Sequence, residues 1–284
     1  MKKFFIWFAA ALITLSAVIY QRVTGPTNPL KVTFSLGGEN YKASFPRSLE
    51  TLVSLNEINS SEVTSELKVK LEPAKSDISL LVMYKRYPRE DSLKTIKALY
   101  KEGAYYLEMP SQPPAGKIIY YPLLIKDCKE IMLQKESGII LRFKAPVSSR
   151  ILIPHIILMF AAMLFSNFAG IAAFFNISKI GKYAIITLIA LGVGGLVFGP
   201  LVQKAAFGAY WTGWPFGQDL TDTKTLFAFL IWLTAWFLNK KKKRKFLYTI
   251  AAAVTLLVYT IPHSTAGSQF DYEKGVVITG AAKE

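Results

Sequence analysis

The chain has 284 residues, of which 52% are hydrophobic, and its formal net charge at neutral pH is +15. A mean hydropathy of +0.31 over this length exceeds what one water-soluble core needs, so the composition excludes an ordinary soluble domain. The single cysteine, Cys128, excludes both an intramolecular disulfide and a CxxC redox pair.

The chain begins with a basic tripeptide, Met1-Lys2-Lys3, followed by the apolar stretch Phe4–Tyr20. A signal peptide and a membrane anchor share this pattern. No clear small-x-small cleavage site precedes Gln21-Arg22, which favours an uncleaved anchor over a cleaved leader. Residues 1–21 are therefore predicted to form an N-terminal transmembrane anchor, and either alternative places the following domain outside.

Residues 22–149 are predicted to form one β-sandwich-like domain. Gly37-Gly38 separates two alternating segments, which is a hairpin signal. Seven segments are rich in β-branched and aromatic residues and are predicted as strands: Leu30–Leu36, Asn40–Phe45, Ser65–Leu71, Asp77–Tyr84, Ala104–Met109, Lys117–Ile125 and Gly138–Lys144. Apolar residues at helical spacing predict short helices over Ser48–Leu55 and Ser92–Lys101.

This domain contains no histidine, which excludes a Ser-His or Cys-His nucleophile within it. Its carboxylates form no recognisable catalytic pair. The sequence leaves enzymatic activity open but favours a protein that is not an enzyme.

Residues 150–263 are predicted to form four transmembrane helices, since a helical span takes about 20 residues. The apolar stretches are Ile151–Phe175, Tyr183–Val202, Thr225–Leu238 and Phe246–Ile261. Residues 203–224 are expected to form an external Trp-rich loop and residues 264–284 an external tail. The predicted fold class is an α+β membrane protein: an N-terminal anchor helix, an external β-sandwich-like domain and a four-helix transmembrane bundle.

Basic residues near span ends predict the orientation, because they are retained on the cytoplasmic side. Met1–Lys3, Asn176–Lys182 and Asn239–Lys245 hold two, two and six basic residues and no acidic one. All three are cytoplasmic if the five spans are real, and all 19 acidic residues are then outside. We therefore expect a multi-pass protein of the cell (inner or plasma) membrane. Residues 22–149 and the C-terminus are then extracytoplasmic, or periplasmic.

The distribution of positive charge argues against a nucleic-acid partner. Much of the excess lies in the cytoplasmic flanks, and the exterior segment Gln21–Arg150 has 20 basic against 14 acidic residues, a diffuse surplus. Basic flanks favour anionic lipid headgroups. The predicted partner of the run Lys240–Lys245 is therefore the lipid bilayer.

Both histidines of the chain lie in Ile-Pro-His tripeptides, His155 at the start of the second span and His263 at the end of the fifth. The topology places both on the outer face. Neutral imidazole is a common ligand for metals and haem iron, so the pair is a candidate site for haem or a transition metal. The alternative is that each amphipathic ring only lies at the membrane interface.

A loop of aromatic residues lies on the same face, between the third and fourth spans. The segment that runs from Gly208 through Trp211, Trp214 and Asp219 to Leu233 resembles the tryptophan-rich haem-handling segment of membrane proteins that assemble c-type cytochromes. The resemblance covers about residues 208–233 and implies that Trp211, Trp214 and Asp219 bind a cofactor, with external histidines as haem ligands. The spacing from Trp214 to Asp219 is longer than in that family, and Pro215-Phe216-Gly217 interrupts it.

Three functions follow from these features. The first is a haem or metal handling site at the outer membrane face, with His155 and His263 as ligands. The second is a non-catalytic, membrane-anchored binding or assembly protein whose external sandwich docks a protein partner. A small-molecule transporter comes third, because no span carries a charged residue at its middle.

Overall fold

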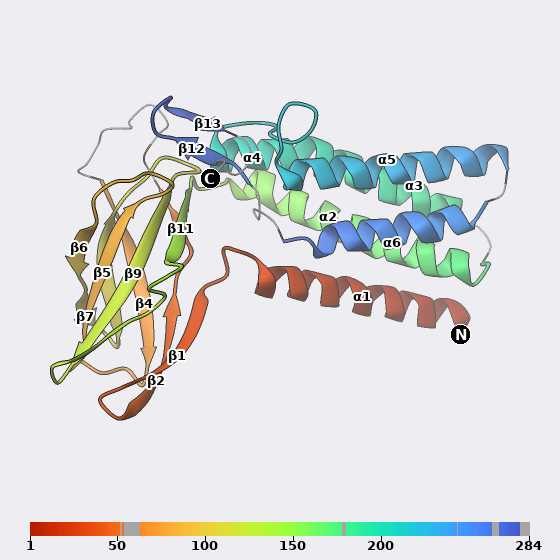
Figure 1. Cartoon of the computed structure of the whole chain (residues 1–284). Coiled ribbons are helices and arrows are strands. Elements are labelled where there is room, and N and C mark those ends of the chain that lie inside the picture. The colour runs from red at the N-terminus through yellow and green to blue at the C-terminus, as the bar shows by residue number, and fades with distance from the viewer. Residues whose placement is uncertain (52, 54–62, 178–179, 243, 263–266, 279–284) are drawn as a thin grey trace. The chain divides into compact units, whose positions relative to one another are not determined.

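The computed structural model describes all residues except 52, 54–62, 178–179, 243, 263–266 and 279–284; of Lys241, only the backbone is described (Figure 1). The chain divides into two compact units. A helical unit comprises residues 1–26, 147–205 and 209–267, and a strand-rich unit comprises residues 27–146, 206–208 and 268–284. The architecture is α+β, with an N-terminal apolar helix, a sheet-rich unit and several further apolar helices.

The strand-rich unit is a sandwich of two sheets around one apolar core (Figure 1). One sheet has the order β1-β2-β4-β8-β7 and the other the order β3-β11-β9-β5-β6, with β10 paired to β9. The strands of the first sheet are β1 (Leu30–Leu36), β2 (Glu39–Phe45), β4 (Thr64–Glu72), β8 (Ala104–Pro110) and β7 (Leu99–Lys101). Those of the second are β3 (Ser48–Glu50), β11 (Ile139–Lys144), β9 (Lys117–Lys126), β5 (Ser79–Arg86), β6 (Lys94–Lys97) and β10 (Lys129–Met132).

All seven segments predicted as strands are strands. Alternation explains the success, because one face of each strand enters the core: in β4, Leu67, Val69 and Leu71 are buried while their neighbours are exposed. Gly37 and Gly38 both have positive φ and form the two-residue turn between β1 and β2. The hairpin prediction is therefore confirmed.

The two short helices predicted in this unit are wrong where the structure describes them. Ser48–Glu50 is strand β3, which pairs in parallel with β11; most of the remainder of Ser48–Leu55 lies outside the described residues. Ser92–Lys101 contains β6 and β7, which belong to different sheets. The chain crosses between the sheets at Ala98, and this crossing produces an apolar spacing that resembles a helical one.

The C-terminal segment also contributes to this unit. Gln269–Asp271 (β12) and Val276–Ile278 (β13) form an antiparallel hairpin. The backbone N–H of Phe270 donates to the Ala115 carbonyl at 3.1 Å, and Phe270 is fully buried. The described part of the segment expected to be a tail is therefore a folded hairpin on the sandwich.

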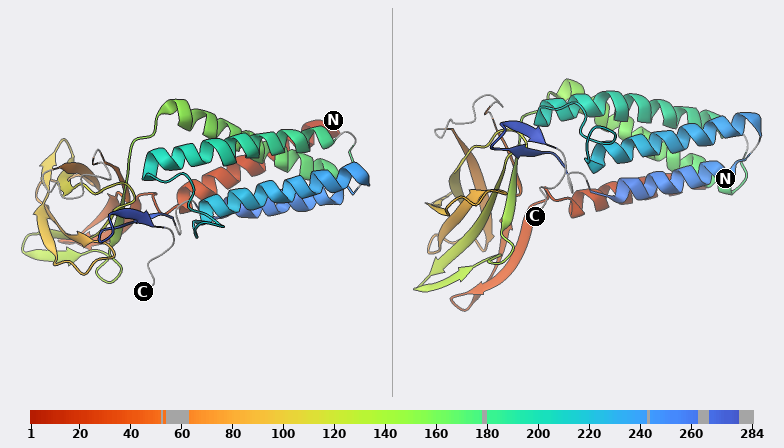
Figure 2. Two further views of the ribbon diagram at one scale, coloured as in Figure 1. Left: turned by 90° about the horizontal axis from the view of Figure 1, so that it is seen from above. Right: turned by 45° about the horizontal axis from the view of Figure 1, so that its top comes forward.

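The helical unit contains every predicted span as a helix (Figure 2). The helices of the chain are α1 (Lys2–Thr24), α2 (Ser149–Phe174), α3 (Gly181–Ala190), the π-helix η1 (Leu191–Phe198), α4 (Gly199–Phe207), α5 (Leu220–Lys241) and α6 (Phe246–Thr260). All belong to the helical unit except the last two residues of α4. Within the described ranges, three helical segments are long and apolar enough to cross a membrane: α1, α2 and the continuous α3-η1-α4. Helix α6 is apolar but shorter.

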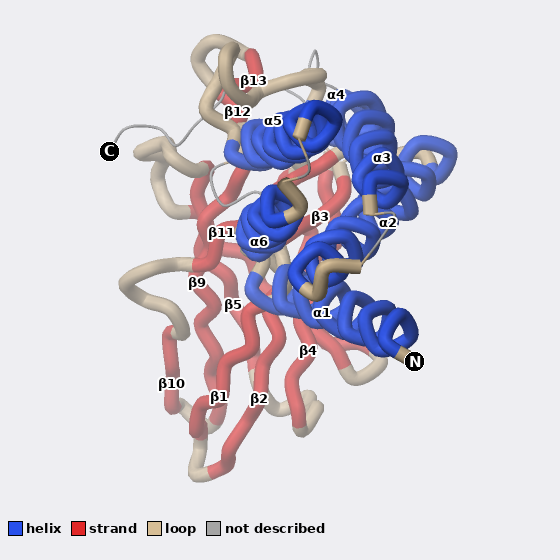
Figure 3. Tube along the Cα trace, turned by 90° about the vertical axis from the view of Figure 1, so that its right-hand side faces the viewer, coloured by secondary structure: helices blue, strands red, loops and turns tan. Residues whose placement is uncertain are grey.

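Helix α2 is central to this unit and contacts α1, α3, η1 and α6 (Figure 3). Helix α1 packs on α2 through Trp7, whose ring stacks on Phe168 at 4.0 Å. Deeper in the same interface, Asn167 donates to the Thr14 hydroxyl at 3.0 Å, and both side chains are buried. The N-terminal helix is therefore an integral part of the helical unit.

Candidate functional site

The aromatic loop, residues 208–219, connects α4 to α5 within a network of buried polar groups. Asp222, in the first turn of α5, reaches back to the loop. Its carboxylate accepts the backbone N–H of Thr212 at 2.7 Å and that of Gly213 at 3.2 Å. Gly213 lies so close to this helix that a Cβ there would be 2.6 Å from the Cβ of Asp222. The loop backbone is thereby fixed against the start of α5.

A second carboxylate, Asp219, holds the same loop. It is the N-cap of α5 and accepts the backbone N–H of Thr221 at 2.7 Å. The Thr212 hydroxyl lies 3.2 Å from Asp219 and 3.3 Å from Asp222, and the Gln203 amide of α4 also hydrogen-bonds to it. Asp219 and Asp222 are only 5% and 6% exposed, so their carboxylates are buried and hydrogen-bond to groups of the loop.

The aromatic side chains of the loop divide into one internal and three external residues. The Trp211 indole N–H donates to the carbonyls of Gly213 at 3.0 Å and Trp214 at 3.2 Å, so it closes the loop from within. Tyr210, Trp214 and Phe216 are 57%, 62% and 84% exposed. Of the three loop residues predicted to bind a cofactor, Trp211 and Asp219 have structural roles and Trp214 alone presents its ring outward.

His155 lies in the second turn of α2 and contacts the π-helix. Its Nδ1 is 2.8 Å from the Gly194 carbonyl, and because a carbonyl only accepts, Nδ1 carries the proton. The same carbonyl accepts the backbone N–H of Gly199, as the wider π-helical turn requires. In the neutral imidazole this arrangement leaves Nε2 as the unprotonated ring nitrogen, the atom that would ligate a metal.

The predicted partner of His155, His263, lies outside the described residues. The proximity of the two imidazoles therefore stays a prediction. Among the residues that the structure describes, no three His, Cys, Asp or Glu side chains form a group that could hold a metal ion.

Sequence reasoning missed a second buried polar cluster, in the sandwich. Lys117 of β9 is 9% exposed, and its ammonium donates to Oε1 of Gln269 on β12 at 3.0 Å. Tyr272 continues the cluster: its hydroxyl accepts the Lys117 backbone N–H at 3.1 Å and lies 3.0 Å from Oε1 of Gln112. Only the folded hairpin brings these residues together, because Lys117 and Gln269 are 152 positions apart.

Burial dominates the electrostatics of this cluster. It lowers the pKa of Lys117 to about 8, assisted by the positive charge of Arg142, its cross-strand partner on β11. Burial also raises the pKa of Tyr272 to about 12. A cavity of about 500 Å³ adjoins the cluster between the hairpin and residues 88–91, with Gln269, Tyr272 and Arg89 in its wall.

A scan against models of known protein families, a search of curated proteins and a search of solved structures each returned no match.

Proposed function

We propose that the chain is a five-span membrane protein that binds a partner protein at the extracytoplasmic face through the aromatic loop. The observation that carries this proposal is the exposure of Tyr210, Trp214 and Phe216 on a backbone fixed by two buried carboxylates. The basic flanks of the sequence support an orientation with this loop outside.

Two physical arguments favour a docking loop over a simple interfacial belt. Burying a carboxylate is unfavourable unless hydrogen bonds compensate for the lost hydration. An aromatic residue of an interfacial belt does not need buried carboxylates to hold it, because any helix end can present such a side chain. In addition, tryptophan and tyrosine dominate the energetics of protein interfaces, and a preorganised loop loses little conformational entropy on binding. The aromatic loop combines exposed aromatic side chains with a backbone that is already fixed before a partner binds.

Photo-crosslinking in native membranes tests the proposal. Phe216 is replaced by a benzophenone-bearing phenylalanine analogue, and the same analogue at Phe174, which is 73% exposed at the end of α2, is the control. We expect a discrete protein adduct from position 216 and none from position 174, with loss of the adduct when Trp214→Ala is added. Adducts to lipid alone at both positions would contradict a docking role.

A second candidate is the haem or transition-metal site, with His155 and His263 as ligands. The observation that favours it is the hydrogen bond from Nδ1 of His155 to a backbone carbonyl, the arrangement that orients metal-binding histidines. Absorption spectroscopy and metal analysis of the purified protein test this candidate. A haem band or a stoichiometric metal, lost in both His155→Ala and His263→Ala, is expected; a colourless, metal-free preparation would argue against it.

A further inference from the structure

We propose that the helical unit binds an anionic phospholipid, with one acyl chain in the groove between α5 and α6 and the phosphate at the basic turn that joins these helices. This inference goes beyond the proposed docking function and concerns the opposite ends of α5 and α6.

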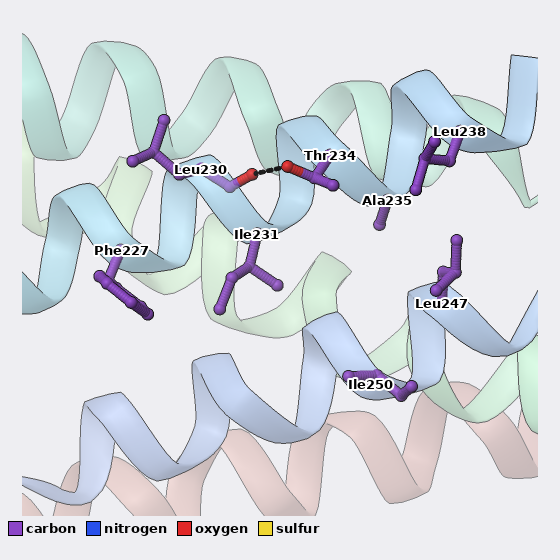
Figure 4. A pocket seen from close by; sticks show the side chains of 8 residues that line it. All are labelled: Phe227, Leu230, Ile231, Thr234, Ala235, Leu238, Leu247 and Ile250. Atoms are coloured by element: carbon purple, nitrogen blue, oxygen red, sulfur yellow. Dashed lines mark hydrogen bonds between the residues drawn. The ribbon is translucent and has the colours of Figure 1, made fainter.

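The groove between α5 and α6 is a cavity of about 240 Å³ with apolar walls (Figure 4). Phe227 and Ile231 of α5 and Leu247 and Ile250 of α6 are among the side chains that line it. The one hydroxyl of the wall, Thr234 Oγ1, donates to the Leu230 carbonyl at 2.8 Å and leaves a surface without free polar groups. Such a surface fits a hydrocarbon chain.

The two helices are locked together beside this groove. Trp232 is fully buried, its indole N–H donates to Thr255 at 2.9 Å, and its ring stacks on Tyr248 at 5.9 Å. Meanwhile Phe227 and Ile250 are 59% and 50% exposed. The Trp232 contacts therefore join α5 to α6, while the side chains that line the groove remain partly exposed.

The groove ends where Leu238 and Leu247 complete its wall, next to the basic turn, whose described basic side chains are Lys240, Lys242, Arg244 and Lys245. Asn239 links the end of α5 to Arg244: its Oδ1 accepts the Arg244 backbone N–H at 2.9 Å, and its amide donates to the Ala235 carbonyl at 2.8 Å. The side chains of Lys242 and Arg244 are exposed, and neither forms an ion pair within the described part of the chain. Two exposed cations thus belong to the turn next to which the apolar groove ends.

A second cavity, of about 410 Å³, flanks the other side of α6 and shares Ile250 with the groove. Its walls combine apolar Phe174 and Phe246 with polar Asn176 and Lys245. The Lys245 ammonium donates to Oδ1 of Asn176 at 2.8 Å. Polar and apolar side chains thus meet beside the start of α6, at the same end of the helix as the basic turn.

Charge decides between a lipid and a second copy of the chain as the occupant of the groove. A second copy packed symmetrically on this groove would bring two basic turns together, each with six basic residues in 239–245. An anionic headgroup instead gains about 1 kcal/mol per nearby basic residue. Basic pockets between helices are also where anionic headgroups bind in membrane proteins.

Native mass spectrometry of the full chain, released from nanodiscs that contain equal amounts of phosphatidylglycerol and phosphatidylcholine, tests the proposal. We expect one retained phosphatidylglycerol and little phosphatidylcholine. The double variant Lys242→Gln/Arg244→Gln removes two cations and is expected to weaken phosphatidylglycerol binding about 30-fold. Its matched control is Lys2→Gln/Lys3→Gln, which removes the same charge from an exposed segment away from the groove.

The apolar part of the site is tested separately. Ile250→Trp fills the groove and should abolish retention, whereas Leu257→Trp on the same helix, at a site 66% exposed and outside both cavities, should not. Leu247→Trp serves as a second blocking variant if the melting temperature of Ile250→Trp shows that it is misfolded. Equal retention of the two lipids, or equal losses in the variants and their controls, would overturn the proposal. So would a crosslinked dimer that joins two copies through Ile250.

Discussion

The Asp222 carboxylate accepts the backbone N–H of Thr212 at 2.7 Å, across ten residues of chain, and this contact holds the aromatic loop against α5. We predict that Asp222→Ala lowers the free energy of unfolding by about 3 kcal/mol, because two buried backbone N–H groups lose a charged acceptor. Unfolding of the purified protein in detergent micelles, followed by heat or denaturant, measures the loss. Asp219→Asn is the control, since asparagine is an equally good N-cap and should cost less than about 1 kcal/mol. Similar losses in both variants would show that Asp222 has no special role.

The glycines of the π-helix are predicted to be required for close packing. A Cβ at Gly194 would lie 2.5 Å from the Cβ of Leu158 on α2, so Gly194→Ala should cost about 1–3 kcal/mol by overpacking. Gly181→Ala, at the start of α3, would meet no described atom within 4 Å and should be neutral or slightly stabilising. Melting temperatures of the two variants in the same detergent provide the comparison. An unchanged melting temperature in Gly194→Ala would contradict the packing argument.

The buried ammonium of Lys117 is predicted to give a pH-dependent stability in the alkaline range. Burial lowers its pKa to about 8, below the ordinary value of 10.5, so the unfolded state binds more protons between these two values. Because stability rises with pH wherever the unfolded state binds more protons, this lysine makes the protein more stable as the pH increases from about 8 to about 10.5. Below about pH 8 the full cost of burying the charge applies.

Lys117→Met removes that cost. We expect this variant to be more stable than the parent at about pH 7, by at most about 3 kcal/mol, and the difference to shrink toward about pH 10. The lost hydrogen bond to Gln269 reduces the gain at every pH equally. Hydrogen exchange of β9 amides in the full chain, measured at both pH values, isolates the effect. A constant difference between variant and parent would show that the charge of Lys117 does not matter.

The exposed thiol of Cys128 provides a test of the expected topology. It is the sole cysteine of the chain and lies at the turn between β9 and β10. We predict that a membrane-impermeant maleimide labels it on intact cells. In a Cys128→Ser background, Lys242→Cys should be labelled only after the membrane is permeabilised. The reverse pattern would invert the orientation and place the aromatic loop inside.

Local patterns in the sequence were sufficient to predict the principal elements. Strands such as β4 and the apolar helices α1, α2 and α6 follow from alternation or apolar length, which depend only on neighbouring residues. Asp219 also carried a local signal, because an aspartate directly before an apolar run is typical of a helix N-cap.

The features that the sequence did not predict depend on contacts between residues that are distant along the chain. The crossing of the chain from β6 to β7 between two sheets has no local periodicity, so it was mistaken for a helix. Trp211 and His155 each hydrogen-bond to a backbone carbonyl, of Gly213 and of Gly194 respectively. These contacts depend on which carbonyls folding brings next to the two side chains. The same is true of the Lys117 cluster, whose members come from two distant segments.

The sequence by itself determined that this protein has an apolar helical unit and a sandwich, because hydrophobic periodicity is written residue by residue. The tertiary structure alone decided which polar groups became buried partners and which aromatic side chains remained exposed. Burial and hydrogen bonding depend on which atoms folding brings close together. Composition and the spacing of residues along the chain do not specify these neighbours. Hydrogen bonding gives Asp219 and Trp211, two residues of the predicted cofactor site, a role in holding the aromatic loop that only the structure shows.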